Sequence, residues 1–110
     1  QAKLAKRMAI ERKVVRHLIR TAKKHGFKLV KVFDGEEMIR SELESAAMDT
    51  VFSVDESTIY FHHPDQPKSH CAVIVLGNDG WDAIGDHSEG PLWDEVMAEC
   101  DAYADKLEGE

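Results

Sequence analysis

Side chains that could ligate a metal ion gather in the second half of the chain. They are His62, His63, His70, Asp82, Asp86 and His87. Imidazole nitrogens and carboxylate oxygens are common ligands of zinc and related metals. In a regular strand, however, His62 and His63 would point to opposite sides, and the chain has neither a His-x-x-x-His helix nor a Cys-x-x-Cys knuckle. A metal-dependent enzyme that uses His62 or His63 with His70 and His87 therefore ranks last of three hypotheses, and we expect no cofactor.

Nucleophilic catalysis has even less support from the residue types. The serines lack a Gly-x-Ser-x-Gly nucleophile elbow. Cys71 lies in an apolar run and Cys100 falls on the apolar side of a predicted helix, where a thiol usually packs as a small hydrophobic group. Paired acids such as Glu36-Glu37 and Asp94-Glu95 stand in the first turns of predicted helices, where carboxylates favour the helix dipole. We therefore predict a protein without enzymatic activity.

Charge is distributed very unevenly along the chain. Residues 1–31 hold 11 of the 14 Lys and Arg residues and a single acid, Glu11, so this segment carries about +10. Residues 32–110 hold 3 basic and 20 acidic residues, about −17, and the whole chain carries −7. A separation of this kind is typical of a protein with a charge-polarised interaction surface.

The basic segment is predicted to form one long helix, from Ala2 to about His25. At 100° per residue, an apolar stripe along one side contains Leu4, Met8, Val15, Leu18, Ile19 and Ala22. The opposite side, here called the basic face, contains Arg12, Lys13, Arg16, Arg20, Lys23 and Lys24. Glu11 falls inside the apolar stripe, and its spacing predicts an ion pair with Arg7, four residues earlier. We expect the helix to pack into the core and to leave only the basic face to a partner.

A strand and a short helix are predicted next. Residues 27–33 alternate apolar and basic side chains, as in a strand with one solvated face. Asp34 and Glu37 have the spacing of a capping box, which predicts that a helix opens at Asp34 and ends near Met48 or Asp49.

A run of strands with a period of two follows this helix. Residues 50–54 and 57–62 are predicted strands joined by a tight turn at Asp55-Glu56, and prolines mark residues 63–69 as a loop. Residues 70–76 are apolar on both faces, which predicts a central strand covered on both sides. The hairpin chemistry of Gly77–Gly80 then predicts a returning strand over residues 81–87.

The last helix begins at Pro91, a residue suited to the first helical turn. Its buried stripe is predicted to contain Leu92, Val96, Cys100, Tyr103 and Leu107, with Trp93 and Met97 at its margins, and its other side is acidic. The order of elements predicts a single α+β domain over residues 1–110. A mainly antiparallel sheet of about four to five strands packs with an N-terminal, a short central and a C-terminal helix.

Composition also bears on location. The longest apolar run, Cys71 to Leu76, is far too short to span a membrane, and no segment resembles a secretory signal. Two cysteines do not make a disulfide framework, so we expect reduced thiols and a cytoplasmic protein.

Three functions follow from these patterns, and the metal-dependent enzyme described above is the third. The first is a non-enzymatic protein that binds another macromolecule through its charge-polarised surface, with a protein partner or self-association as a dimer. Trp81, next to a turn, is a candidate anchor for that partner. The second is nucleic-acid binding, in which the basic face follows a phosphate backbone.

One part of the chain resembles a known group of proteins. Residues 73–88, VIVLGNDGWDAIGDHS, precede an acidic helix, and residues 53–64 read SVDESTIYFHHP. This order of strand, hairpin and acidic helix is similar to that of small uncharacterised proteins carried by bacteriophages and prophages. The resemblance covers about the last two thirds of the chain. The resemblance implies a cytoplasmic accessory protein of a phage or mobile element and supplies no catalytic residues.

Overall fold

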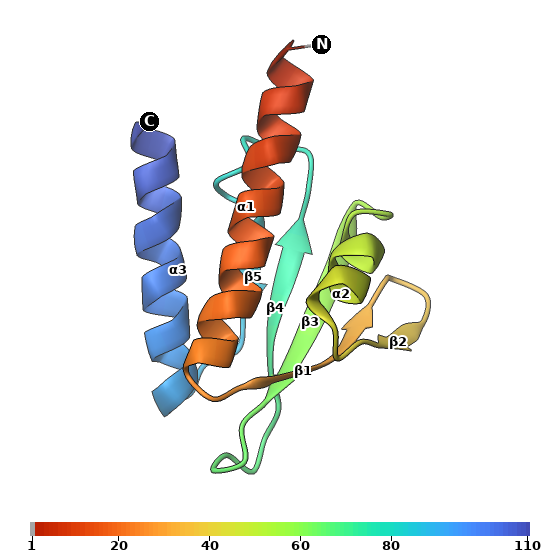
Figure 1. The fold of residues 1–110 in the computed structure, drawn as a ribbon, viewed down its shortest axis with the longest axis vertical. Coiled ribbons are helices and arrows are strands. Elements are labelled where there is room, and N and C mark those ends of the chain that lie inside the picture. Colours follow the sequence, from red (N-terminus) through yellow and green to blue (C-terminus); the bar gives the residue numbers. More distant parts are fainter. Residues whose placement is uncertain (1) are drawn as a thin grey trace.

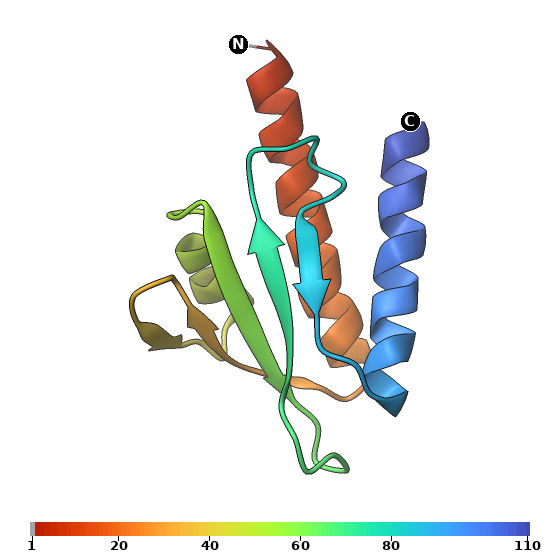
Figure 2. The same ribbon diagram turned by 180° about the vertical axis from the view of Figure 1, so that it is seen from behind.

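A five-stranded antiparallel sheet carries all three helices on one of its two faces (Figure 1; Figure 2). The computed structural model describes residues 2–110. The helices are α1 (Ala2–Lys24), α2 (Glu44–Val51) and α3 (Pro91–Gly109). The strands are β1 (Lys28–Phe33), β2 (Met38–Arg40), β3 (Glu56–His62), β4 (His70–Val75) and β5 (Ile84–His87). The predicted α+β fold, with its three helices and antiparallel sheet, is confirmed.

The strands lie in the order β2-β1-β3-β4-β5, and all neighbouring pairs are antiparallel. β3 occupies the centre, and its side chains alternate between the buried face and a half-exposed face. β1 pairs with β2 on one side and with β3 on the other, although β2 and α2 lie between β1 and β3 in the sequence. The later strands pair in the order in which they follow in the chain.

The core lies between the sheet and the helices. α1 contributes one stripe, in which Val15, Leu18 and Ile19 are fully buried. The sheet supplies Ile59 and Phe61 from β3, with other apolar side chains from its neighbours. Burying a side chain of this size stabilises a fold by about 1.5–3 kcal/mol, so packing, more than helix propensity, holds the basic helix against the domain.

The first turns of α1 do not take part in this core. They extend past the end of the sheet (Figure 1), and Leu4 and Met8 are 46% and 40% exposed. The prediction that these two residues continue the buried stripe is therefore wrong. The helical period is correct, but no strand lies beneath the N-terminal turns to cover them.

The short central helix begins later than predicted. The Asp34 carboxylate accepts hydrogen bonds from the amides of Glu36 and Glu37, at 2.9 and 2.8 Å, as a helix cap would. Here these bonds close a turn between β1 and β2, because the Asp34 amide also donates to the Glu37 carbonyl. The residues after the turn form β2, and α2 starts only at Glu44.

α2 also ends later than predicted. It runs to Val51, whose side chain is fully buried in the core, and residues 52–55 form the connection to β3. The predicted strand over residues 50–54 and its tight turn at Asp55-Glu56 are therefore wrong. The β-branched residues Thr50 and Val51 favour a strand locally, but tertiary packing overrides that weak preference.

β4 is neither central nor covered on both sides. It lies next to the edge strand β5, and its side chains alternate between buried and half-exposed positions. No helix lies over the half-exposed face in Figure 2. The returning strand is also shorter than predicted, because β5 begins at Ile84 and Trp81 lies in the preceding turn.

α3 begins at Pro91 as predicted, but it is rotated relative to the expected stripe. Trp93 and Met97, placed at the margins, are buried, whereas Leu92 and Tyr103 are only partly buried. Within residues 2–110, no helix is both long and apolar enough to cross a membrane.

Two histidines stack on aromatic rings of α3. The His17 ring stacks on Tyr103 with a centroid distance of 4.0 Å, and the His70 ring stacks on Trp93 at 5.6 Å. Burial lowers the pKa of both histidines below the usual 6.5, and the nearby carboxylates of Glu99 and Asp94 offset this only in part. Near pH 6 the unfolded chain therefore binds more protons at these sites than the folded chain does.

We expect the free energy of unfolding to fall as the pH is lowered from about 7.5 to about 5.5. This window lies above the usual pKa of the carboxylates, so the loss reports the histidines. Urea titrations at the two pH values measure it. His17→Phe, which keeps a ring against Tyr103 but cannot be protonated, should reduce the loss. An unchanged or higher stability at the lower pH would contradict this assignment.

Candidate interaction surface

The basic face is partly covered by carboxylates of the same chain. On α2, Glu44 accepts two hydrogen bonds from the Arg20 guanidinium, at 2.9 and 3.1 Å, and lies 4.0 Å from Arg16. The hydrogen bond from Arg20 is the main reason that the pKa of Glu44 is lowered. These two arginines therefore already have an anionic neighbour.

The last cation of the basic face is paired on the other side of α1. Lys24 donates a hydrogen bond to the Glu99 carboxylate of α3, and the imidazole of His25 contacts the same carboxylate. These bonds lower the pKa of Glu99, the one from Lys24 most strongly. The acidic side of α3 thus meets the basic helix within one subunit.

The remaining cations of the basic face have other surroundings. The Arg12 guanidinium lies over the Phe52 ring, 4.5 Å from its centroid. No ion pair joins Lys13 or Lys23 to a carboxylate within residues 2–110. The six predicted residues are therefore not one uniform cationic surface, because Arg16, Arg20 and Lys24 are at least partly neutralised.

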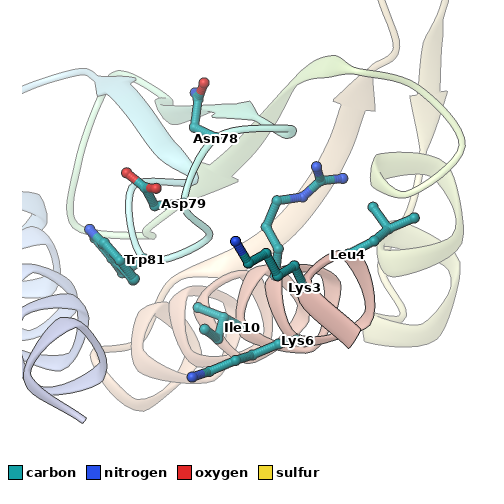
Figure 3. A pocket seen from close by; sticks show the side chains of 8 residues that line it. Lys3, Leu4, Lys6, Ile10, Asn78, Asp79 and Trp81 are labelled. Carbon is teal, nitrogen blue, oxygen red and sulfur yellow. The ribbon is translucent and has the colours of Figure 1, made fainter. Parts of the chain in front are cut away.

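Trp81 lines a groove beside the N-terminal half of α1. One cavity of about 440 Å³ separates the loop that carries Asn78, Asp79 and Trp81 from the α1 side chains opposite it (Figure 3). A second cavity of about 410 Å³ adjoins it, and the two share Lys6, Ile10 and Trp81. We call the two cavities together the N-terminal groove.

The floor and the rim of the N-terminal groove differ in character. Ile10, Trp81 and Leu107 supply apolar surface, and the exposed Leu4 extends it. Cations from α1 stand around this surface, namely Lys3, Lys6, Arg7 and Lys13. Acids occur only on the loop and on the end of α3, at Asp79, Glu108 and Glu110. Of the predicted interaction residues, the structure brings Lys13 and Trp81 together here, and Lys23 lies elsewhere on α1.

A buried carboxylate ties α1 to the groove loop. The Glu11 side chain is only 2% exposed, and it accepts a hydrogen bond of 2.7 Å from the Gly77 amide. Arg7 lies 3.6 Å away, which confirms the predicted pair. The contact with Gly77 was not predicted, although an acid inside an apolar stripe signals that a polar partner is needed.

Gly80 allows the loop to approach α1 closely. Its φ of +106° favours glycine, and a Cβ there would lie 2.9 Å from the Ile10 Cβ and 3.1 Å from the Arg7 carbonyl oxygen. Gly77 has a similar φ of +105°, but nothing lies within 4 Å of a Cβ at that position. The two glycines thus share a backbone requirement and differ in available space.

We expect Gly80→Ala to lower the free energy of unfolding by about 3 kcal/mol and Gly77→Ala by about 1 kcal/mol. The matched pair isolates the steric contact, because both substitutions strain the backbone and only one meets α1. Urea denaturation followed by circular dichroism measures both. Equal losses would mean that the loop does not rest on α1 as described.

The histidines do not assemble into a metal site. His63 packs edge-on against Phe27, with ring centroids 5.0 Å apart, and His70 bonds to the Ser88 hydroxyl at 3.0 Å. In the part of the chain that the structure describes, no group of three or more His, Cys, Asp or Glu side chains could hold a metal ion. The arrangement therefore gives the metal hypothesis no support.

Comparisons with known proteins were made for the whole chain. The resemblance of residues 73–88 to small bacteriophage proteins remains a prediction, because it rests on the texture of strand, hairpin and helix rather than on a chemical motif. Comparison with protein-family models, with curated proteins and with solved structures finds no significant match to this chain.

Proposed function

We propose that this protein is a non-enzymatic interaction protein that binds another protein through the N-terminal groove. The observation that carries the proposal is the combination of an apolar floor, made by Ile10 and Trp81, with a rim of four α1 cations. Apolar side chains left exposed beside such a floor are typical of docking sites. The fitting partner is a segment with both apolar and acidic side chains.

The polarity of the chain supports a protein partner over a nucleic acid. A phosphate backbone would need a continuous track of free cations, but Arg16, Arg20 and Lys24 lie against Glu44 and Glu99. Nucleic-acid binding by α1 remains the alternative, and the experiment below distinguishes the two.

The proposal also covers the cellular location and the genetic origin of the protein. Cys71 and Cys100 are free thiols, which is consistent with a cytoplasmic protein. The similarity of residues 73–88 to bacteriophage and prophage proteins points to an accessory protein of a mobile element.

Site-specific photo-crosslinking in the natural host cell tests the proposal. A photoreactive amino acid at Leu4, beside the groove, should give a discrete protein adduct, whose crosslinked peptide is acidic by mass spectrometry. The same amino acid at Asp65 is the control, because residues 63–69 form the loop at the opposite end of the molecule (Figure 1). No such adduct should form there.

A charge-matched pair of variants shows whether the groove is responsible. Lys6→Glu with Lys13→Glu should remove the adduct, because both cations line the groove. Lys23→Glu with Lys28→Glu makes the same change in net charge outside the groove, near the C-terminal end of α1 and at the start of β1, and should leave the adduct. Adducts that survive the first pair, or that consist of nucleic acid, would overturn the proposal.

A further inference from the structure

The sheet face that carries no helix has apolar side chains near its middle and charged side chains around them. Side chains alternate along β3 and β4, so the residues that flank buried ones such as Ile59 and Ile74 in the chain point to the opposite face. On that face the registers place five residues side by side, one from each strand: Met38, Phe33, Thr58, Val73 and Asp86. We call this the open face.

The neighbouring rows complete the open face. One row runs through Arg40, Lys31, Tyr60 and Cys71, and the Lys31 ammonium lies 5.3 Å from the centroid of the Tyr60 ring. A second row pairs Glu56 with Val75, and a third pairs Lys28 with His62.

The composition of the open face differs from that of a solvated sheet. An antiparallel sheet with one face in water normally carries polar side chains there. Here Phe33, Tyr60, Val73 and Val75 are only half-buried, and Met38 is 50% exposed. Figure 2 shows no helix on this side of the sheet. Charged residues surround this apolar group, and the exposed Met38 extends it to the β2 edge, so the face has the mixed composition of an interface rather than that of a fully solvated sheet.

The charges of the open face separate toward two opposite corners, a basic one at β2 and β1 and an acidic one between the start of β3 and β5. Lys28, Lys31 and Arg40 lie on β1 and β2, whereas Glu56 and Asp86 lie at the start of β3 and on β5. A surface with an apolar centre, one basic corner and one acidic corner is complementary to itself. Two copies can face each other across a two-fold axis that lies in the interface and is perpendicular to the line joining the two corners. In that arrangement, the basic corner of each copy lies over the acidic corner of the other.

We propose that the open face pairs with the same face of a second copy of this chain, as a sheet-on-sheet dimer. Packed sheets with interdigitated apolar side chains are a standard interface geometry. The proposal does not rest on the N-terminal groove, which lies on the helix side of the sheet, so a dimer formed in this way leaves the groove free for another partner.

Sedimentation velocity on the full chain tests the dimer. The wild-type protein should sediment with twice the 12.4 kDa mass of one chain at micromolar concentration. Val73→Lys should weaken the dimer at least about tenfold, because it buries a charge at the centre of the interface. Lys6→Glu with Lys13→Glu, in the N-terminal groove, is the matched control and should leave the dimer unchanged.

If Val73→Lys folds poorly, charge reversal at the basic and acidic corners of the open face still tests the dimer. Lys31→Glu with Arg40→Glu should give monomers, as should Glu56→Lys with Asp86→Lys. Mixing the two double variants should restore a dimer that contains one chain of each. A monomeric wild-type protein would overturn the proposal, as would a dimer that persists in both double variants.

Discussion

Replacing Trp93 with alanine is expected to lower the free energy of unfolding by about 4 kcal/mol, the largest loss from any single substitution in the chain. Trp93 on α3 is fully buried and joins three other rings. Its ring centroid lies 5.1 Å from that of Phe27, 5.2 Å from Phe61 and 5.6 Å from His70. Alanine would leave a cavity where the last helix meets the sheet.

Trp93→Phe is the control for this prediction. The Trp93 Nε1 atom is buried and has no hydrogen-bond partner among residues 2–110, so phenylalanine loses ring volume but no hydrogen bond. We expect a loss of about 1–2 kcal/mol for this variant. Urea denaturation followed by far-ultraviolet circular dichroism measures both. A loss below about 2 kcal/mol for Trp93→Ala would show that α3 is not anchored through this ring.

Replacing Glu11 with alanine is expected to cost about 3 kcal/mol. The substitution leaves the Gly77 amide without its acceptor and leaves Arg7 without the carboxylate 3.6 Å away. The Glu11 side chain is buried although Gly77 is exposed, so the expected cost comes mainly from the lost contacts of the carboxylate. The contact also joins residues 66 positions apart, so its loss should loosen the groove loop from α1.

Hydrogen exchange separates this local effect from general destabilisation. In Glu11→Ala, the Gly77 amide should exchange much faster, even under conditions in which the core strands stay protected. Glu11→Gln keeps an oxygen that can accept the bond, and it should cost only about 1 kcal/mol and retain most of the protection. Fast exchange at Gly77 in the wild-type protein would contradict the assigned bond.

Much of the fold was predictable because the signals are local. The period of the apolar residues in α1 and α3 follows directly from residue spacing, and Pro91 marks the start of α3. The strand over residues 57–62 and the loop that follows it were predicted from alternation and from prolines.

The errors arose where one local signal serves two structures. Asp34 bonds to the amides two and three residues ahead both at a helix start and in the turn that it actually forms. Thr50 and Val51 have the side chains of strand residues, but the core accepts Val51 from a helix. The apolar composition of residues 70–76 predicted that other elements cover both faces of this strand. In the structure, helices cover only one face of β4.

The separation of charge between residues 1–31 and the rest was evident from the order of residues, because net charge does not depend on folding. Which charges remain free depends on contacts between distant segments. Glu44 is 24 positions from Arg20, and Glu99 is 75 from Lys24, so packing alone brings each pair together. The basic face therefore looks uniform in the sequence, whereas in the fold it is divided. Arg16, Arg20 and Lys24 are paired with carboxylates, Arg12 lies over Phe52, and Lys13 lies in the N-terminal groove.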